Sequence, residues 1–337
     1  MNPVIPLSVL ELVPVSEGMA RSTAFDHTRT LAADVDRLGY KRLWVAEHHG
    51  STTFMASASS VVLADLAHHT ERIRLGSGGV MLPNHAPLMV AEYYGTLATL
   101  YGDRFDLGIG RAPGTDPMTA AALRRGEPDL NSFASDVVAI IDLLGEPRSL
   151  PGGVRAIPGE GTNVPVWMLG SSTGGAQVAA ALGLPYSFAS HFAPQQIREA
   201  LQVYREHFQA DVRTAQVDRP TVMAGANVII ADTQAEAERL FTTSQQMRVH
   251  LRTGQLGPLL PPVDDLSTVI PEAALQFAGR PDERATFVGT AQTVHDRLSE
   301  FVEEHSLDEV IVTTYTFDPQ HRRESYDALA QVWGLPG

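Results

Sequence analysis

Cysteine is absent from the 337 residues, and Lys41 is the only lysine. Without cysteine the chain can form no disulfide, no thiolate metal site and no thiol nucleophile. A Schiff-base lysine would have to be Lys41, which precedes a predicted strand. Active sites of α/β barrels lie at the carboxyl ends of the strands, so the position of Lys41 argues against aldolase and pyridoxal-phosphate chemistry.

Positive charge and long apolar runs are also scarce. The formal net charge is −14, whereas nucleic-acid-binding proteins concentrate Lys and Arg. No apolar stretch approaches the length of a membrane span, and no basic segment opens a secretory signal. We therefore expect a cytoplasmic protein without nucleic-acid or membrane partners.

What is present is a regular alternation of strand and helix patterns. With 44% hydrophobic residues the chain can bury a large core. The predicted strands are Ile5–Leu10, Arg42–Ala46, Arg74–Val80, Phe105–Gly110, Val166–Leu169, Pro185–Ala189, Val222–Ile230 and Glu309–Tyr315. The predicted helices are Ser22–Leu38, Ala56–His69, Pro87–Tyr101, Ser132–Leu144, Gly174–Leu182, Pro194–Gln209, Ala235–Arg252, Ala291–His305 and Pro319–Val332. Eight strands separated by helices predict an α/β fold, a (β/α)8 TIM barrel, in a single domain over residues 1–337.

Two segments interrupt the alternation: residues 111–131, after the fourth strand, and residues 253–286, before the last β/α unit. Long excursions in a compact domain are often lids or binding loops, although decoration or an oligomer contact would explain them equally well. We interpret residues 253–286 as an inserted loop or lid.

A turn rich in small residues follows the fifth strand, between Gly170 and Gly175. It would place Ser171, Ser172 and the backbone N–H groups of Gly174 and Gly175 at a helix N-terminus, where unsatisfied donors and the helix dipole favour a phosphate. The alternative is that these residues serve only to turn the chain.

The sequence Glu47-His48-His49 follows the second strand, where barrels place catalytic groups. A histidine there can act as a general acid or base, and Glu47 could orient it. A hydrogen-bonded pair of histidines that closes a loop is the alternative. A metal site would need more ligands, and the first strand lacks the His-x-His of metal-dependent barrel hydrolases, so no metal is predicted. His85 and His191 follow the third and sixth strands and could line the barrel mouth.

Two further strand ends carry candidate binding groups. Gly78 and Gly79 would let a flat ligand approach the backbone, unless they only allow close packing. Arg111 follows the fourth strand and could bind a phosphate or carboxylate, unless it pairs with a neighbouring acid. These strand ends together offer a base (His48), a flat surface (Gly78 and Gly79), a cation (Arg111) and a turn that could bind phosphate. Such a set would suit a mononucleotide with a planar ring.

The same motifs resemble the bacterial luciferase-like family of flavin-dependent monooxygenases. The matching stretches are Leu43-Trp-Val-Ala-Glu-His-His49, Arg74-Leu-Gly-Ser-Gly-Gly-Val-Met-Leu-Pro83, Ala91-Glu92, Asp103-Arg-Phe-Asp-Leu-Gly-Ile-Gly-Arg111, Trp167-Met-Leu-Gly-Ser-Ser172 and Phe287-Val-Gly-Thr290. The resemblance implies a (β/α)8 barrel that holds reduced FMN, usually supplied by a separate flavin reductase, and that acts as a homodimer.

By this resemblance His48 is the catalytic histidine, Gly78 and Gly79 line the flavin ring, and Arg111 and the turn at Gly170 to Gly175 bind its phosphate. O2 would add to the flavin C4a carbon, and the resulting hydroperoxide would oxygenate a small organic substrate in a pocket that includes Glu47 and His191.

Gly110 stands where light-emitting luciferases carry a cysteine, and Gly170 stands where they carry an acid, so light emission is not expected. Three alternatives stay open: an F420-dependent oxidoreductase of the same fold, a non-catalytic flavin-binding protein, and a metallohydrolase.

Overall fold

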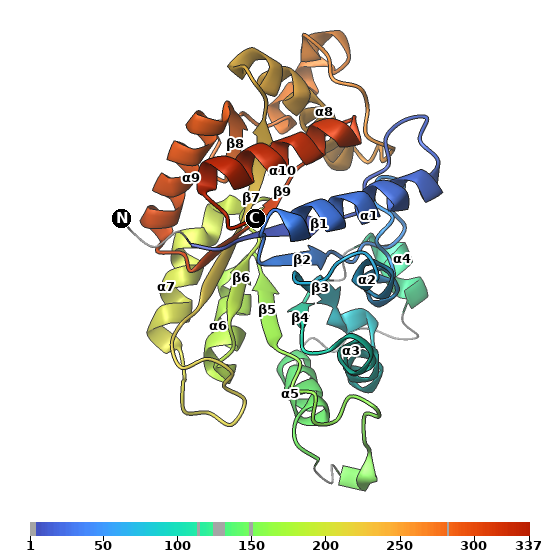
Figure 1. Cartoon of the computed structure of the whole chain (residues 1–337), viewed down its shortest axis with the longest axis vertical. Coiled ribbons are helices and arrows are strands. Elements are labelled where there is room, and N and C mark those ends of the chain that lie inside the picture. The colour runs from blue at the N-terminus through green and yellow to red at the C-terminus, as the bar shows by residue number, and fades with distance from the viewer. Residues whose placement is uncertain (1–4, 113–114, 124–131, 148–150, 282) are drawn as a thin grey trace.

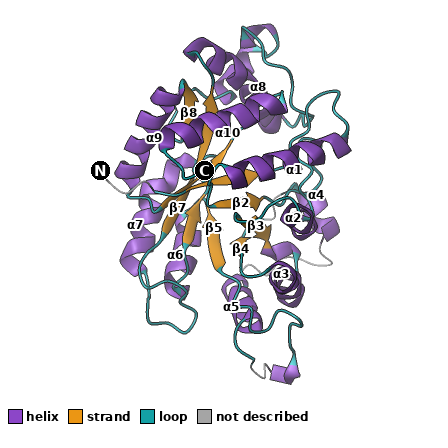
Figure 2. Cartoon of the chain, viewed as in Figure 1, coloured by secondary structure: helices purple, strands orange, loops and turns teal. Residues whose placement is uncertain are grey.

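Parallel strands form the centre of the molecule, and helices surround them (Figure 1, Figure 2). The computed structural model describes residues 5–112, 115–123, 132–147, 151–281 and 283–337. Its strands are β1 (Leu7–Glu11), β2 (Arg42–Val45), β3 (Arg74–Met81), β4 (Phe105–Gly110), β5 (Val166–Gly170), β6 (Tyr186–Phe188), β7 (Val222–Ile230), β8 (Thr286–Gly289) and β9 (Glu309–Thr313).

Eight of these strands close into a barrel in the order β1-β2-β3-β4-β5-β6-β7-β9, and β9 pairs again with β1. All pairings between these strands are parallel. The predicted (β/α)8 barrel is confirmed.

A further strand, β8, lies outside the closed barrel and was not predicted. It pairs with the last four residues of β7, Asn227–Ile230, beyond the residues of β7 that pair with β6. A four-residue strand directly after a loop-like stretch has too little alternation to be recognised from sequence. The inserted segment therefore precedes an additional β8–α9 unit, and the last unit, β9–α10, follows that one.

Ten α-helices are found in the described residues. They are α1 (Arg21–Arg37), α2 (Ser59–Ala67), α3 (Pro87–Tyr101), α4 (Pro117–Leu123), α5 (Phe133–Leu144), α6 (Thr173–Leu182), α7 (Ile197–His207), α8 (Gln234–Thr253), α9 (Ala291–His305) and α10 (Pro319–Trp333). None of them combines the length and apolar character that a membrane crossing requires.

Both interrupting segments contain short helices. Helix α4 lies in the first, most of whose remaining residues fall outside the described ranges. In the second, the one-turn helix Leu266–Thr268 and the 3-10 helix Glu272–Phe277 pack on α8 through Val249, Ile270 and Ala278. That residues 253–286 act as a lid stays a prediction.

Successive strand residues alternate between two apolar regions. Leu7 and Val9 of β1 point outward into the large core between strands and helices. Leu10 points inward and packs with Trp44 and Trp167 in the barrel interior. This alternation is the two-residue period of a strand.

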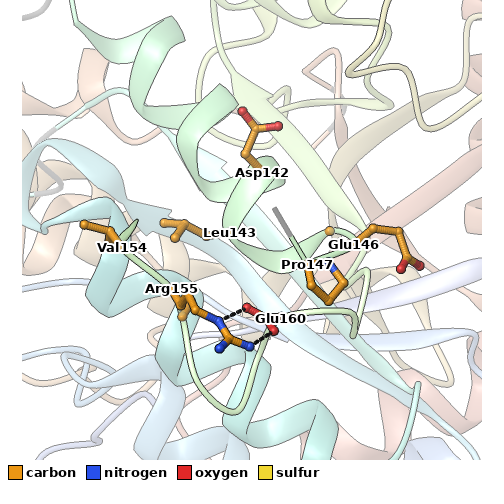
Figure 3. A pocket seen from close by; sticks show the side chains of 9 residues that line it. Asp142, Leu143, Glu146, Pro147, Val154, Arg155 and Glu160 are labelled. Carbon is orange, nitrogen blue, oxygen red and sulfur yellow. Dashed lines mark hydrogen bonds and ion pairs between the residues drawn. The ribbon is translucent and has the colours of Figure 1, made fainter. Parts of the chain in front are cut away.

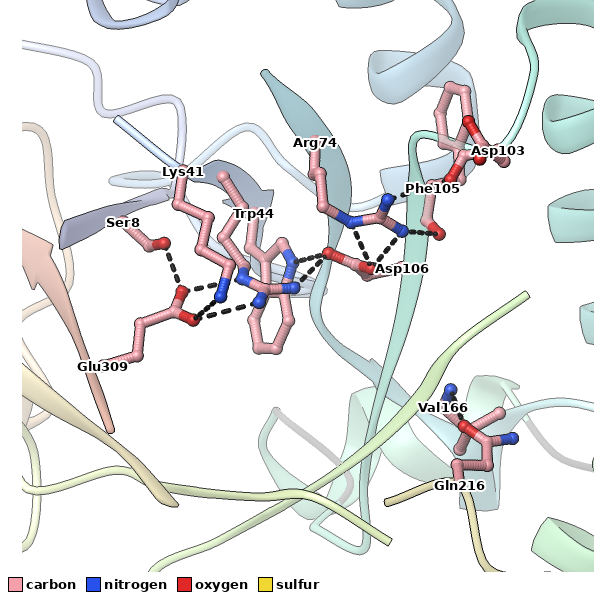
Figure 4. A network of polar contacts seen from close by, with 11 residues as sticks. Ser8, Lys41, Trp44, Arg74, Asp103, Phe105, Asp106, Val166, Gln216 and Glu309 are labelled. Atoms are coloured by element: carbon pink, nitrogen blue, oxygen red, sulfur yellow. Dashed lines mark hydrogen bonds and ion pairs between the residues drawn. The ribbon is translucent and has the colours of Figure 1, made fainter. Parts of the chain in front are cut away.

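The amino-terminal end of the barrel is closed by buried charges (Figure 4). Arg42 binds Glu309 through Nε (2.7 Å) and Asp106 through Nη1 (2.7 Å), and Arg74 binds the other oxygen of Asp106. Burial alone would lower the pKa of Arg42, but the two carboxylates raise it, so the guanidinium stays charged. Lys41 also lies here, 3.2 Å from Glu309. This end of a barrel serves stability rather than chemistry.

Candidate functional site

The predicted site residues lie on four neighbouring strand ends. In the sheet, Val45 of β2 is level with Ser77 of β3, and Met81 of β3 is level with Gly110 of β4, which is level with Leu169 of β5. Residues that directly follow these positions therefore emerge along one arc of the carboxyl-terminal rim. His48, Gly78–Gly79, Arg111 and the β5–α6 turn follow one another along this arc.

The β5–α6 turn brings together donors that could hold an anion, and we call it the cradle. Ser172 is the N-cap of α6 in an extended conformation, and its side chain makes no capping hydrogen bond. The first N–H groups of α6 are therefore left without a side-chain acceptor. The Arg111 guanidinium lies over Gly174: a Cβ placed there would be 3.3 Å from Nη2. Arg111 forms no ion pair with any described residue. Its guanidinium lies beside the N-terminus of α6.

Gly170 and Gly175 shape this turn by permitting a close approach. A Cβ on Gly175 would lie 3.3 Å from the Cα of Gly170, and a Cβ on Gly170 would lie 3.0 Å from the Tyr186 hydroxyl. That hydroxyl donates to the carbonyl of Ser172 (3.2 Å) and so ties the turn to β6. Ser171 is exposed at the tip of the turn.

Gly78 and Gly79 are packed tightly on the side where a side chain would be. A Cβ on Gly78 would come within 2.6 Å of Leu10 Cδ1, and one on Gly79 within 2.8 Å of the Gly108 carbonyl. The peptide bond between the two glycines is cis. Close packing thus explains why both positions are glycine. Gly78 is partly exposed, so its backbone can still contact a ligand.

His48 carries a buried ring nitrogen without a partner. Its Nδ1 has no hydrogen bond, and its ring packs against Phe54 with centroids 5.5 Å apart. Burial lowers the pKa of His48 to about 4, against a smaller opposing effect of Glu47. The imidazole is therefore neutral at pH 7 and can accept a proton.

Glu47 is directed at two other histidines. Its Oε1 lies 2.7 Å from His49 Nε2 and 2.8 Å from His85 Nε2, and its side chain is 2% exposed. Burial would raise the pKa of Glu47, but the hydrogen bonds from His85 and His49 lower it overall. The interaction expected from sequence, in which Glu47 orients His48, is replaced by a bridge between His49 and His85.

The ligand atoms of Glu47, His49 and His85 all lie within 4.8 Å of one another, so this group could hold a metal ion. The sequence shows Glu47 beside His49, but nothing in it indicates that His85, after β3, joins them. No metal had been predicted, and distances of 2.7 to 2.8 Å are also those of ordinary carboxylate–imidazole hydrogen bonds.

His191 lies across the barrel mouth, on the segment after β6. Its backbone oxygen accepts from Asn227 Nδ2 (2.7 Å), and its Nδ1 is buried without a partner. The pKa of His191 is lowered to about 4 by burial first, and then by the nearby Arg248 and His48. Sequence reasoning missed Arg248, because helix α8 gives no sign of which face covers the barrel.

A separate hollow lies at the other end of the barrel, beside the carboxyl end of α5 (Figure 3). Helices run antiparallel to the strands, so this hollow is remote from the carboxyl-terminal rim. Arg155 pairs with Glu160 there, and Arg213 pairs with Asp142. We assign the hollow no chemistry.

Comparison with known proteins gives consistent matches over the whole chain. The family model described as luciferase-like monooxygenase matches residues 7–309. A relative in Escherichia coli K12, named luciferase-like monooxygenase, is 42% identical over 329 residues, which are 97% of each chain. The crystal structure of apo-MsnO8 is 34% identical, with a TM-score of 0.91 and coverage of 98% and 99%.

More distant structures share the fold. The oxygenating constituent of 3,6-diketocamphane monooxygenase from Pseudomonas putida, in complex with FMN, has a TM-score of 0.69 at 16% identity, over 97% of each chain. An F420-dependent secondary alcohol dehydrogenase has the same TM-score at 12% identity, over 97% and 98% of the two chains.

Proposed function

The chain belongs to the family of luciferase-like monooxygenases, and from that premise we propose that it uses reduced FMN and O2 to oxygenate a small organic substrate. The observation that carries the cofactor assignment is the cradle at the β5–α6 turn. There an uncapped helix N-terminus and the Arg111 guanidinium face the same space, and this donor set suits a terminal phosphate.

The other groups are arranged as an elongated mononucleotide would need them. The phosphate would bind Arg111 and the amides of Gly174 and Gly175, with Ser171 and Ser172 beside it. The flavin ring would lie toward Gly78 and Gly79 of β3, between this cradle and His48. When bound, reduced FMN supplies the electrons that activate O2.

His48 would manage the proton. Its neutral imidazole can accept a proton from a reacting group and return it, since its Nδ1 has no protein partner. Phe54 packs against His48 and against Tyr315, with centroids 5.5 and 5.6 Å apart. This aromatic wall would exclude water from the reacting groups.

FMN is preferred over F420 because of the chemistry named for the relatives. Inserting oxygen requires a cofactor that reacts with O2, whereas the deazaflavin F420 carries hydride. The relative at 42% identity is named a monooxygenase. A merely flavin-storing protein would not need a neutral, unpartnered histidine beside the ring.

A separate flavin reductase and a second copy of the chain are the proposed partners. Several apolar side chains are exposed on two helices that pack together, Val61 on α2 and Met89, Tyr93 and Leu100 on α3. The three α3 residues follow helical spacing and share one face. Covering this face in a homodimer would remove its apolar surface from water.

The cofactor assignment is tested by titrating FMN and riboflavin into Arg111→Ala. Because only FMN carries the phosphate, its affinity should fall at least about tenfold while riboflavin binding is retained. Arg252→Gln, an exposed cation on α8, is the matched control. Equal losses for FMN and riboflavin would refute the phosphate assignment. Binding of F420 without binding of FMN would favour the hydride-transfer alternative.

A further inference from the structure

The barrel mouth holds a second arginine, Arg248 of α8. This side chain is half-buried, and no described carboxylate lies within ion-pair distance of it. Its contacts among the described residues are neutral: Nη2 donates to Thr286 Oγ1 (3.3 Å), and the guanidinium lies 5.2 Å from the centroid of Phe241. Burying a cation without a partner is unfavourable, and proteins normally supply a carboxylate.

Arg248 is connected to the reacting end of the site. Thr286 Oγ1, which accepts from Arg248, also lies 3.5 Å from Asn227 Nδ2, and that amide donates to the backbone of His191. His191 in turn presents a buried Nδ1 without a partner, as His48 does. Through Thr286 and Asn227, Arg248 is thus linked to the segment that carries His191, whose Nδ1 packs against Gly225.

The inserted segment holds the arginine in place. Gly279 packs so closely that a Cβ there would come within 2.5 Å of Arg248 Nη1, and the Gly279 carbonyl accepts from Gln245 Nε2 (2.9 Å). Burial lowers the pKa of Arg248, although it stays protonated, and Glu283 opposes the shift from beyond ion-pair distance. At neutral pH His48 and His191 are uncharged. The fixed positive charge on this side of the mouth is therefore that of Arg248.

We propose that Arg248 binds the acid group of the substrate, so that the compound oxygenated is a small organic acid, a carboxylate or a sulfonate, with an apolar body. The body would lie against the aromatic wall of Phe54 and Tyr315, and the acid would take the place of the missing counter-ion. This assignment rests on the proposed monooxygenase function, in which Arg111 already serves the cofactor phosphate.

Calorimetric titration of the full chain, with and without FMN, tests this with acids and their uncharged isosteres. The probes are octanoate, hydrocinnamate and cyclohexanecarboxylate, each against its primary amide, and octanesulfonate to separate sulfonate from carboxylate. At least one acid should bind about tenfold or more tighter than its amide. The preference should vanish in Arg248→Gln and persist in Arg252→Gln, which removes an exposed cation from the same helix.

Arg248→Lys keeps the charge but not the planar fork, so it should keep the preference for acids with several-fold weaker binding. If Arg248→Gln does not fold, the Arg248→Lys variant is used for the test instead. The proposal is overturned if wild-type protein distinguishes no acid from its amide, or if the preference survives Arg248→Gln. It is also overturned if Arg248→Gln weakens FMN more than riboflavin, because Arg248 would then serve the cofactor. If wild-type protein binds no FMN, the flavin function fails, and the acid–amide contrast still decides the role of Arg248.

Discussion

At the scale of single residues, burial rather than charge pairing sets the protonation of the histidines at the mouth. His48 and His191 both have pKa values near 4 because their rings are desolvated and their Nδ1 atoms lack partners. His49 and His85 share the carboxylate of Glu47 instead. Two adjacent residues, His48 and His49, thus have different surroundings: His49 bonds a carboxylate, whereas His48 keeps an unbonded ring nitrogen.

Replacing His48 by alanine should leave FMN affinity near that of the wild type and lower product formation by roughly a hundredfold to ten-thousandfold. Since the wild-type base is deprotonated above its pKa of about 4, the oxygenation rate should be flat from neutral pH down to about pH 5 and fall below that. His207→Asn, an exposed histidine on α7, is the control. Unchanged turnover in His48→Ala would remove this residue from the mechanism.

At the scale of elements, the amino end of α6 is where strand, turn and helix combine into the proposed phosphate site. Gly170 and Gly175 let the helix approach the end of β5, and the missing side-chain cap leaves the N–H groups open. Arg111 arrives from β4, the neighbouring strand. The site therefore exists only where two β/α units meet.

Gly174→Asp would place a carboxylate beside Arg111, in the space assigned to the phosphate. An acidic residue in the first turn also favours the helix dipole, so the melting temperature should not fall. FMN affinity should drop at least about tenfold and riboflavin affinity should change little. Gly174→Ala adds only a Cβ, 3.3 Å from Arg111 Nη2, and should retain most FMN binding. FMN binding by Gly174→Asp at wild-type affinity would contradict the cradle.

At the scale of the whole molecule, stability and binding are assigned to opposite ends of the barrel. The ion network of Arg42, Glu309 and Asp106 closes the amino-terminal end (Figure 4). Arg111 and Arg248, which form no ion pair with a described residue, lie at the carboxyl-terminal mouth. Paired charges at the amino-terminal end stabilise the scaffold. Cations without a paired carboxylate at the other end can bind an anionic ligand.

Arg42→Met should therefore destabilise the protein without weakening the cofactor. The change leaves Glu309 and Asp106 buried without their main cation, a loss of about 3 to 5 kcal/mol in the free energy of unfolding. Urea denaturation measures the first effect, and FMN titration of the folded variant checks the second. A loss of FMN affinity in the folded variant would show that the two ends are coupled.

The proposed dimer is tested on the apolar face of α3. Leu100 is 65% exposed there, and Leu100→Asp should shift the protein from dimer to monomer in sedimentation velocity, because a charge would be buried in the interface. Leu256→Asp changes another exposed leucine, in the inserted segment, and should leave the dimer intact. A wild-type protein that sediments as a monomer would refute the homodimer.

The sequence by itself determined the barrel and the positions of its strand ends, because a parallel sheet leaves a strong alternation of apolar strands and helices in the chain. It also located His48, Gly78–Gly79, Arg111 and the β5–α6 turn, since residues after consecutive barrel strands must share one rim. Strand β8 was too short for its pattern to be recognised.

Only the tertiary structure decided which of these groups meet. Glu47 is adjacent to His48 in sequence but bonds His49 and His85, and His85 lies 38 residues away from it along the chain. Arg248 comes from the seventh β/α unit of the barrel and reaches the mouth because α8 and Gly279 hold it there. Such contacts depend on the directions of side chains in the folded barrel, and those directions are set by packing between segments remote in sequence.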